Sequence, residues 1–314
     1  MRIAYIDLNR TNNAKNRIAA CIGYFDGMHR GHQTLIRRTK ALADKYGCGS
    51  ALITFDPDPW VTIKGIQPSE TEHITTMRQK INLAVELGIE NIFILKFTWE
   101  MSQLSYDEFA KRVLGQLNLR ALVCGFDFHY GKNGAGNAET LRNQAFYPVE
   151  IVEAVMEDGE KISSTRITSL IKEGKIEEAS FLLGHPFDLE GKVVEGRHKG
   201  TEMGFPTANI RISDEYVIPK NGVYAAWVTI DRKYYGAMVN IGHNPTLNYS
   251  EKISVEAHIF NFDGLIYGKT VSVSLLKFMR PEIQFRSREN LIMQMEQDSK
   301  IITEYLRTEA IGQL

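Results

Sequence analysis

Apolar runs alternate with amphipathic stretches along the first 155 residues of the chain. The runs have the length of buried strands, and the stretches between them repeat their apolar positions with the spacing of helices. The pattern predicts strands at residues 17–23, 50–55, 91–96, 121–125 and around 149–155, and helices at 32–45, 75–87 and 105–117. Because such alternation produces parallel strands with crossover helices, we expect an α/β domain with a Rossmann-like parallel sheet.

The pattern changes near residues 184–186, where short segments of alternating apolar and polar residues begin. Segments of this kind, separated by turns, favour a small antiparallel β-barrel. The expected strands are residues 191–195, 223–230, 234–241, 254–260 and 270–276, and a helix follows at 288–307. A length of 314 residues also favours two domains. We place them at residues 1–184 and 185–314.

The composition narrows the class of protein. Apolar residues make up 43% of the chain and charged residues 24%, which is ordinary for a globular protein. The net charge of -1 provides no general attraction to nucleic acid or membranes, and no long apolar segment or secretory leader is visible. Cys21, Cys48 and Cys124 lack metal-binding spacing and suit a reducing compartment. We expect a cytoplasmic protein without nucleic-acid or membrane partners, and the sequence leaves its oligomeric state open.

The segment GYFDGMHRGH, residues 23–32, has the features of a phosphate-binding turn. It joins a predicted strand to a predicted helix, whose first N–H groups attract anions. Gly23, Gly27 and Gly31 allow a sharp turn and a close approach of the ligand. His29 and His32 are three residues apart, so both rings can face one side and donate hydrogen bonds to phosphate. The alternative is that one histidine caps the helix and the other packs in the core.

Six motifs in a fixed order resemble a known family. They are GYFDGMHRGH, GFDFHYGKNGAGN (125–137), ISSTRI (162–167), GFPTAN (204–209), NIGHNPTL (240–247) and VEAHIFNFDGLIYGK (255–269). Together they resemble the prokaryotic bifunctional riboflavin kinase/FMN adenylyltransferases, or FAD synthetases, over nearly the whole chain. The resemblance implies an N-terminal FMN adenylyltransferase domain and a C-terminal riboflavin kinase domain. It also implies riboflavin, FMN and ATP as substrates and Mg²⁺ as cofactor.

The resemblance assigns roles in the kinase half. Glu256 looks like the base that acts on the ribityl hydroxyl, and Thr207 and Asn209 hold Mg²⁺ and phosphates, since their oxygen atoms suit a hard cation. Residues 196–200 would form a basic flap over the nucleotide. The alternatives are an ordinary turn at residues 206–209 and a solvated strand residue at Glu256.

In the adenylyltransferase half, the resemblance makes His29 and His32 ligands of the ATP phosphates. Ser164, Thr165 and Arg166 would form a second phosphate-contacting segment at a helix start, although Ser-Ser-Thr is also a good helix cap. The expected ATP- and phosphate-binding residues of this half are Gly23, Phe25, Asp26, Gly27, Gly31, Ser164, Thr165 and Arg166. Those of the kinase half are Gly200, Gly204, Thr207 and Asn209.

Two positions depart from the family's pattern. Relatives commonly have a basic residue where this chain has Thr168, and a histidine where it has Asp58. The loss of one cation facing the triphosphate costs a few kcal/mol of binding or transition-state stabilisation. Arg166 and Lys172 are candidates to compensate.

Four residues at predicted strand ends are candidates for the flavin pocket. Asp127 follows an apolar strand, and the aromatic side chains could stack on the isoalloxazine ring. For each aromatic residue the alternative is plain packing, and for Asp127 it is a turn preference. The candidates are Asp127, Phe128, Tyr130 and Trp60.

Three other functions are consistent with parts of the sequence. In the first, only one domain is active, and Asp58 and Thr168 make the adenylyltransferase the silent one. In the second, the chain is a flavin-binding regulator without turnover. The third, an aminoacyl-tRNA synthetase fragment suggested by HxGH, leaves the barrel motifs unexplained and lacks a basic excess.

Overall fold

The computed structural model describes residues 1–8, 16–196, 200, 203–213, 215–243 and 253–312. The chain divides into two compact units, Met1–Ser164 and Thr165–Leu314. The boundary at residue 184 that we drew from the sequence stays a prediction. Within the described ranges, none of the helices combines the length and the apolar character needed to cross a membrane.

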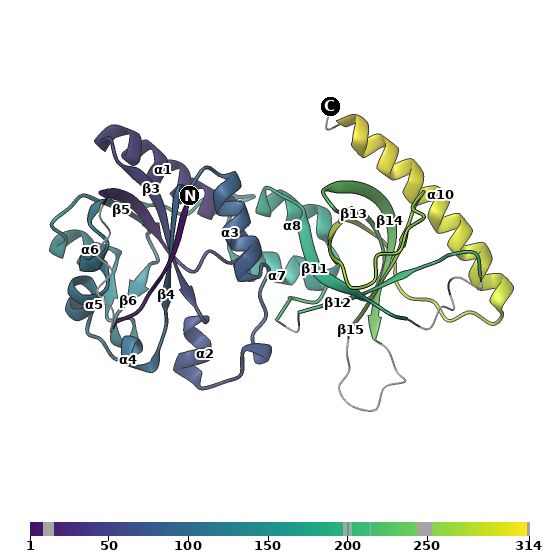
Figure 1. Cartoon of the computed structure of the whole chain (residues 1–314), viewed down its shortest axis with the longest axis horizontal. Coiled ribbons are helices and arrows are strands. Elements are labelled where there is room, and N and C mark those ends of the chain that lie inside the picture. The colour runs from purple at the N-terminus through teal and green to yellow at the C-terminus, as the bar shows by residue number, and fades with distance from the viewer. Residues whose placement is uncertain (9–15, 197–199, 201–202, 214, 244–252, 313–314) are drawn as a thin grey trace. The chain divides into compact units, whose positions relative to one another are not determined.

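The first unit is built on a six-stranded parallel sheet in the order β1-β4-β3-β2-β5-β8. Figure 1 labels its strands β3, β4 and β5. From β2 the chain winds through β3 to β4 on one side, and it then returns to place β5 on the other side of β2. Ligands bind at such a reversal, beyond the carboxyl ends of the strands. The predicted Rossmann-like sheet is confirmed. Its strands are β1 (Arg2–Ile6), β2 (Ile18–Ile22), β3 (Gly49–Asp56), β4 (Asn91–Lys96), β5 (Leu119–Gly125) and β8 (Val149–Val152).

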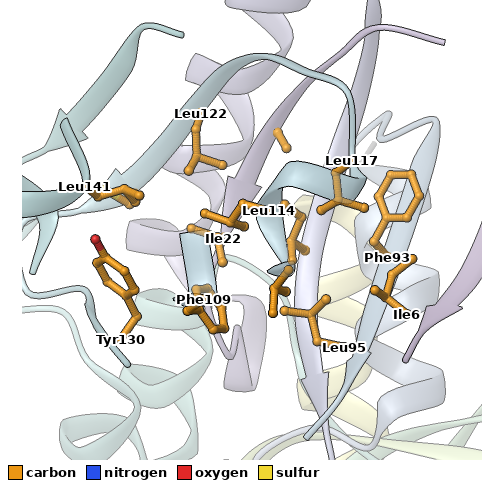
Figure 2. Packing of buried hydrophobic residues seen from close by; sticks show 14 of the residues in the cluster. Ile6, Ile22, Phe93, Leu95, Phe109, Leu114, Leu117, Leu122, Tyr130 and Leu141 are labelled. Carbon is orange, nitrogen blue, oxygen red and sulfur yellow. The ribbon is translucent and has the colours of Figure 1, made fainter. Parts of the chain in front are cut away.

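Helices bury both faces of this sheet, which explains its continuous apolar runs. On one face, Ile22 and Leu122 of the sheet pack with Phe109 and Leu141 from the covering helices (Figure 2). On the other face, the core includes Ile36 of α1. The helices are α1 (Arg30–Tyr46), α2 (Pro59–Lys64), α3 (Met77–Glu86), α4 (Trp99–Ser102), α5 (Tyr106–Arg112) and α6 (Ala138–Gln144).

Short elements connect these strands and helices. The 3₁₀ turns are η1 (Asp26–Met28), η2 (Pro68–Glu70), η3 (Leu114–Gln116) and η4 (Lys132–Gly134). Two small hairpins pair β6 (His129–Tyr130) with β7 (Gly136–Asn137), and β9 (Met156–Glu157) with β10 (Glu160–Lys161). Both hairpins follow β5 or β8, so they extend the chain beyond the carboxyl ends of these strands.

The second unit is a closed antiparallel barrel in the order β11-β12-β15-β14-β13-β16. The predicted barrel and its C-terminal helix are therefore confirmed, and β12 is a strand that the hydrophobic pattern did not reveal. The elements are α7 (Ser164–Glu173), α8 (Ile176–Leu183), β11 (Phe187–Val194), β12 (Ala208–Ile212), β13 (Gly222–Ile230), β14 (Lys233–His243), β15 (Ile253–Ile259), β16 (Thr270–Arg280) and α10 (Arg288–Gly312).

Helix α10 packs against the outside of β13 and β14 through an apolar stripe that includes Ile302 and Leu306. An ion pair joins the helix to β16, since Nε and Nη2 of Arg280 donate to Oδ2 of Asp298 at 2.9 and 2.7 Å. Asp298 is 5% exposed. A buried carboxylate that receives a bidentate guanidinium ties the helix to the barrel.

Candidate active sites

The loop after β2 adopts a left-handed course at three positions. Phe25, Gly27 and Met28 have φ values of 57°, 74° and 42°. Phe25 and Met28 are buried, so their side chains anchor a backbone conformation that L residues seldom adopt. This loop turns the chain from the carboxyl end of β2 into α1.

Asp26 fixes the loop to a segment that is distant in the sequence. Its carboxylate accepts hydrogen bonds from the backbone N–H groups of Ile74 and Thr75 at 3.1 Å and from the Thr75 hydroxyl at 3.2 Å. The Thr75 hydroxyl accepts from the N–H of Gly27 at 2.9 Å. Ser164 donates from its hydroxyl to the carbonyl of Asp26 at 3.0 Å. Asp26 therefore braces the loop, and Ser164 joins the second predicted segment to it.

The two histidines lie together at the start of α1. Nδ1 of His29 accepts from the backbone N–H of His32 at 3.4 Å and caps the helix. The rings stack with centroids 3.6 Å apart. A side chain at Gly31 would approach the His29 ring to 3.0 Å, so glycine permits this arrangement. The alternative of a cap and a packed histidine thus describes part of what the pair does.

His32 has a feature that capping and packing leave unexplained. Its Nδ1 atom is buried and has no hydrogen-bond partner among the residues that the structure describes. Burial, followed by the charges of His29, Lys80 and Lys161, lowers the pKa of His32 well below its ordinary value. The imidazole is therefore neutral at physiological pH, with one N–H donor and one acceptor nitrogen.

Two lysines near His32 were not among the site residues predicted from the sequence. Lys161 pairs with Asp127 and lies 4.9 Å from the centroid of the Phe126 ring. Lys80 is buried on α3. Lys161 directly precedes the ISSTRI motif, so its neighbours in the sequence gave a signal, whereas Lys80 belongs to an ordinary helical pattern.

The remaining candidates for phosphate binding, and the two positions that depart from the family's pattern, lie on α7 or directly before α2. Thr165 and Arg166 follow Ser164 in the first turn of α7, and Thr168 lies on the same helix. Oδ1 of Asp58 accepts from the N–H of Trp60 at 2.8 Å and caps α2, and Oδ2 lies 3.8 Å from Nε2 of His73.

The flavin candidates differ in exposure. Trp60 is 58% exposed, whereas Tyr130 is 5% exposed and belongs to the main core. Phe128 is partly buried and stacks on Tyr130 with centroids 5.7 Å apart. Asp127 is half exposed beside Lys161.

In the barrel, three polar side chains occupy adjacent strands at one level. Asn209 of β12 is paired with Glu256 of β15, which is paired with Asn240 of β14. Val255 and Ala257 are buried on either side of Glu256, so the Glu256 side chain alternates to the outer face. Cross-strand neighbours on one face lie about 5 Å apart, which brings these groups together.

Further contacts fix the carboxylate and its neighbour. The Ser254 hydroxyl donates to Oε1 of Glu256 at 3.1 Å. Nδ2 of Asn240 donates to Oε1 of Glu282 at 3.4 Å. Ser254 and Glu282 were not expected from the sequence. Ser254 lies two residues before Glu256 on the same strand, and this spacing was the available signal.

Close backbone approaches surround Thr207 and Asn209. A Cβ atom at Gly196 would lie 2.0 Å from Nδ2 of Asn209, and one at Gly200 would lie 3.2 Å from Oγ1 of Thr207. Gly204 has φ 83°, which favours glycine. The predicted basic flap at Arg197, His198 and Lys199, and the NPTL part of the fifth motif, lie outside the described residues.

The donor atoms in this part of the barrel suit a hard cation. Thr207 offers a hydroxyl oxygen and Asn209 an amide oxygen, beside the carboxylate of Glu256. No group of three or more His, Cys, Asp or Glu side chains that could hold a metal occurs in the described part of the chain. A hard cation at this place would therefore depend on uncharged oxygens together with the phosphates of a nucleotide.

A Rossmann-like sheet with a loop rich in glycine and histidine at its winding reversal, followed in the chain by a barrel that carries oxygen donors on its outer face, is the architecture of a two-domain transferase that uses a nucleotide. The FAD synthetase family matches residues 11–166, and the riboflavin kinase family matches residues 183–306. The chain belongs to the bifunctional riboflavin kinase/FMN adenylyltransferase family. The predicted family and the predicted bifunctional enzyme are confirmed.

Individual relatives agree with this assignment. The chain is 37% identical to the bifunctional riboflavin kinase/FMN adenylyltransferase of Listeria monocytogenes, covering 91% of both proteins. It is 34% identical to the Bacillus subtilis protein of the same name, covering 95% of both. A crystal structure from Streptococcus pneumoniae, described as a macrolide-efflux protein, is 32% identical with a TM-score of 0.88, over 96% of this chain and 99% of that one. That likeness supports the architecture.

Proposed function

We propose that the barrel phosphorylates riboflavin to FMN and that the N-terminal unit joins FMN to the AMP part of ATP, with Mg²⁺ as the metal in both steps. The observation that carries this division is the placement of Glu256 beside Asn209 on the outer face of the barrel. A carboxylate next to uncharged oxygen ligands suits hydroxyl phosphorylation, which needs a base and a metal-bound polyphosphate.

In the kinase step, Glu256 accepts the proton of the ribityl 5′-hydroxyl. The hydroxyl oxygen attacks the γ-phosphorus of ATP, and ADP leaves. The hydrogen bond from Ser254 orients the carboxylate. Thr207 and Asn209 would hold Mg²⁺, which neutralises phosphate charge when bound. Gly196 and Gly200 leave room for these two side chains, because a Cβ atom at either position would crowd Asn209 or Thr207.

The adenylyl-transfer step makes different demands on its residues. The attacking group is an oxygen of the FMN phosphate, which is already anionic, and pyrophosphate is displaced from the α-phosphorus. A general base is therefore not required, and positioning and charge stabilisation provide the catalysis. A neutral His32 with an unused nitrogen, His29 and the start of α1 suit this role, because they supply donors without abstracting a proton.

Two further parts of the proposal concern the flavin and the compartment. Trp60 and Phe128 are candidates to contact the isoalloxazine ring, since both keep exposed surface, whereas Tyr130 is engaged in the core. Cys21, Cys48 and Cys124 are free thiols, which supports a reducing compartment such as the cytoplasm.

Separation of flavins after incubation with ATP and Mg²⁺ tests the proposal. We expect FAD from incubations started with riboflavin and from those started with FMN. FMN that accumulates without FAD would contradict the role of the N-terminal unit and indicate that Asp58 or Thr168 is not tolerated. FAD formed only from supplied FMN would contradict the role of the barrel.

A further inference from the structure

Lys80 is a buried cation that the mechanism above does not use. It lies on α3, is 2% exposed and is one of the largest fully buried side chains among the residues that the structure describes. Its Nζ atom lies 3.7 Å from the centroid of the Tyr24 ring. Tyr24 belongs to the loop that leads from β2 to His29, residues 23–29, which we name the histidine loop. An ammonium group is costly to bury, so its presence calls for a compensating interaction.

The compensating charges come from three different elements. The carboxylates of Asp26 in η1, Asp56 at the end of β3 and Asp58 before α2 all act on Lys80 electrostatically. Asp26 is 8% exposed, and the side chain of Asp58 is 11% exposed. Three carboxylates therefore act on Lys80, and one of them, Asp26, belongs to the loop that is expected to receive a polyphosphate.

Two imidazole rings complete the surroundings of Lys80. The ring of His73, which precedes α3, is tilted against the ring of Tyr24, with centroids 5.5 Å apart. The charge of Lys80 contributes to the lowered pKa of His32. Without the ammonium, the acidic groups would repel ATP, because charges of one sign in a poorly solvated site interact strongly. The ammonium also helps to keep His32 neutral.

We propose that Lys80 is a positioning residue of the adenylyl-transfer step, whose ammonium offsets Asp26, Asp56 and Asp58 and holds Tyr24 at the start of the histidine loop so that the triphosphate can enter. This inference rests on the proposed assignment of that step to His29 and His32.

The charge state of Lys80 gives the proposal a measurable signature. Burial lowers the pKa of Lys80 to about 8, against the opposing effect of the three carboxylates. The side chain is charged below that pH and becomes neutral as the pH rises through it. The KM for ATP in FAD formation should therefore rise above about pH 8. Riboflavin phosphorylation by the same chain provides the control for pH effects on ATP and Mg²⁺.

Two substitutions separate charge from packing. We expect Lys80→Met to raise the KM for ATP in FAD formation by about tenfold or more, with a smaller change in kcat, as the loss of one charged interaction implies. Lys80→Arg keeps a charge that does not titrate in this pH range. Its KM for ATP should therefore stay close to the wild-type value and should not rise above about pH 8. Lys40→Met is the matched control. Its Nζ donates to the carbonyl of Leu87 near the amino end of β4, away from the loop.

Each result has a definite meaning. A folded Lys80→Met protein with unchanged KM, or a Lys80→Arg protein whose KM for ATP still rises above about pH 8, would overturn the proposal. If the variants do not fold, the wild-type profile decides, and a flat KM across pH 8 would overturn it. His32→Phe separates the assignment of the site to the two histidines from the role of Lys80. If FAD formation survives that change, the assignment of the site fails, whereas if only Lys80→Met is without effect, the role of Lys80 fails.

Discussion

His29 and His32 lie at the start of α1, directly after a loop whose shape depends on distant segments, whereas Asn209, Glu256 and Asn240 are placed by the hydrogen-bond ladder of three neighbouring strands. The loop is held by Thr75 and by Ser164, which are 49 and 138 residues away from Asp26. The barrel residues need only the register of their own strands. Substitutions far from the histidines should therefore disturb adenylyl transfer, while the kinase site should respond mainly to changes in its own side chains.

The largest effect should follow from Glu256→Gln, which removes the proposed base but keeps the shape of the side chain between Asn209 and Asn240. We expect the rate of FMN formation to fall by about 10² to 10⁴-fold, the usual contribution of a general base. FAD formation from supplied FMN should be unchanged. Glu296→Gln on the exposed side of α10 is the control. Loss of both activities in a folded protein would contradict the comparison of two independent sites.

Asp298→Ala tests whether the stability of the barrel depends on one buried contact. Removal of one partner leaves the Arg280 guanidinium uncompensated, and such losses cost about 3–5 kcal/mol. Denaturant unfolding should show this loss, and FMN formation should fail at a lower temperature than FAD formation from FMN. Glu304→Ala, in an exposed pair with Arg307, should change nothing measurable.

His32→Phe separates ring packing from hydrogen bonding in the loop site. The substitution retains the ring contact with Phe25 but removes both nitrogens. We expect FAD formation to fall by about 10²-fold, as for the loss of one transition-state donor, with riboflavin phosphorylation unchanged. An unaltered FAD rate would contradict the assignment of adenylyl transfer to this pair of histidines.

The smallest effect should come from Ser254→Ala, which removes the hydroxyl that donates to Glu256. One hydrogen bond contributes about 1 kcal/mol, so the kcat for FMN formation should fall by several-fold while the KM for ATP stays the same. Ser274→Ala on β16, a strand that does not border β15, is the matched control. An equal loss in both variants would contradict an orienting role for Ser254.

The sequence predicted most of the fold because apolar periodicity reflects burial. It missed β1, whose five residues are mostly exposed and whose parallel partner β4 lies some 90 residues later. It also missed β12, because the PTAN motif that leads into that strand has the composition of a turn. In both cases the strand depends on a partner rather than on its own pattern.

The candidate sites were predictable to different degrees, because some residues are placed by their own strand and others by contacts with distant segments. Glu256 could be placed on an outer face from the alternation of its strand alone. The bracing of Asp26 by Thr75, and the burial of Lys80, depend on a segment that contacts the loop only in the folded chain. A lysine in a helical pattern is normally solvent-exposed, so nothing local distinguished Lys80.

The burial of two of the three thiols offers a practical route to observing the N-terminal unit. Burial raises the pKa of Cys21 and of Cys124 to about 12, which makes both unreactive toward maleimides. Burial also raises the pKa of Cys48, but its side chain is only partly buried and lies directly before β3, at the amino edge of the sheet and opposite the loop. A fluorophore introduced there without mutation would report ligand-induced changes in this unit and leave the loop after β2 unobstructed.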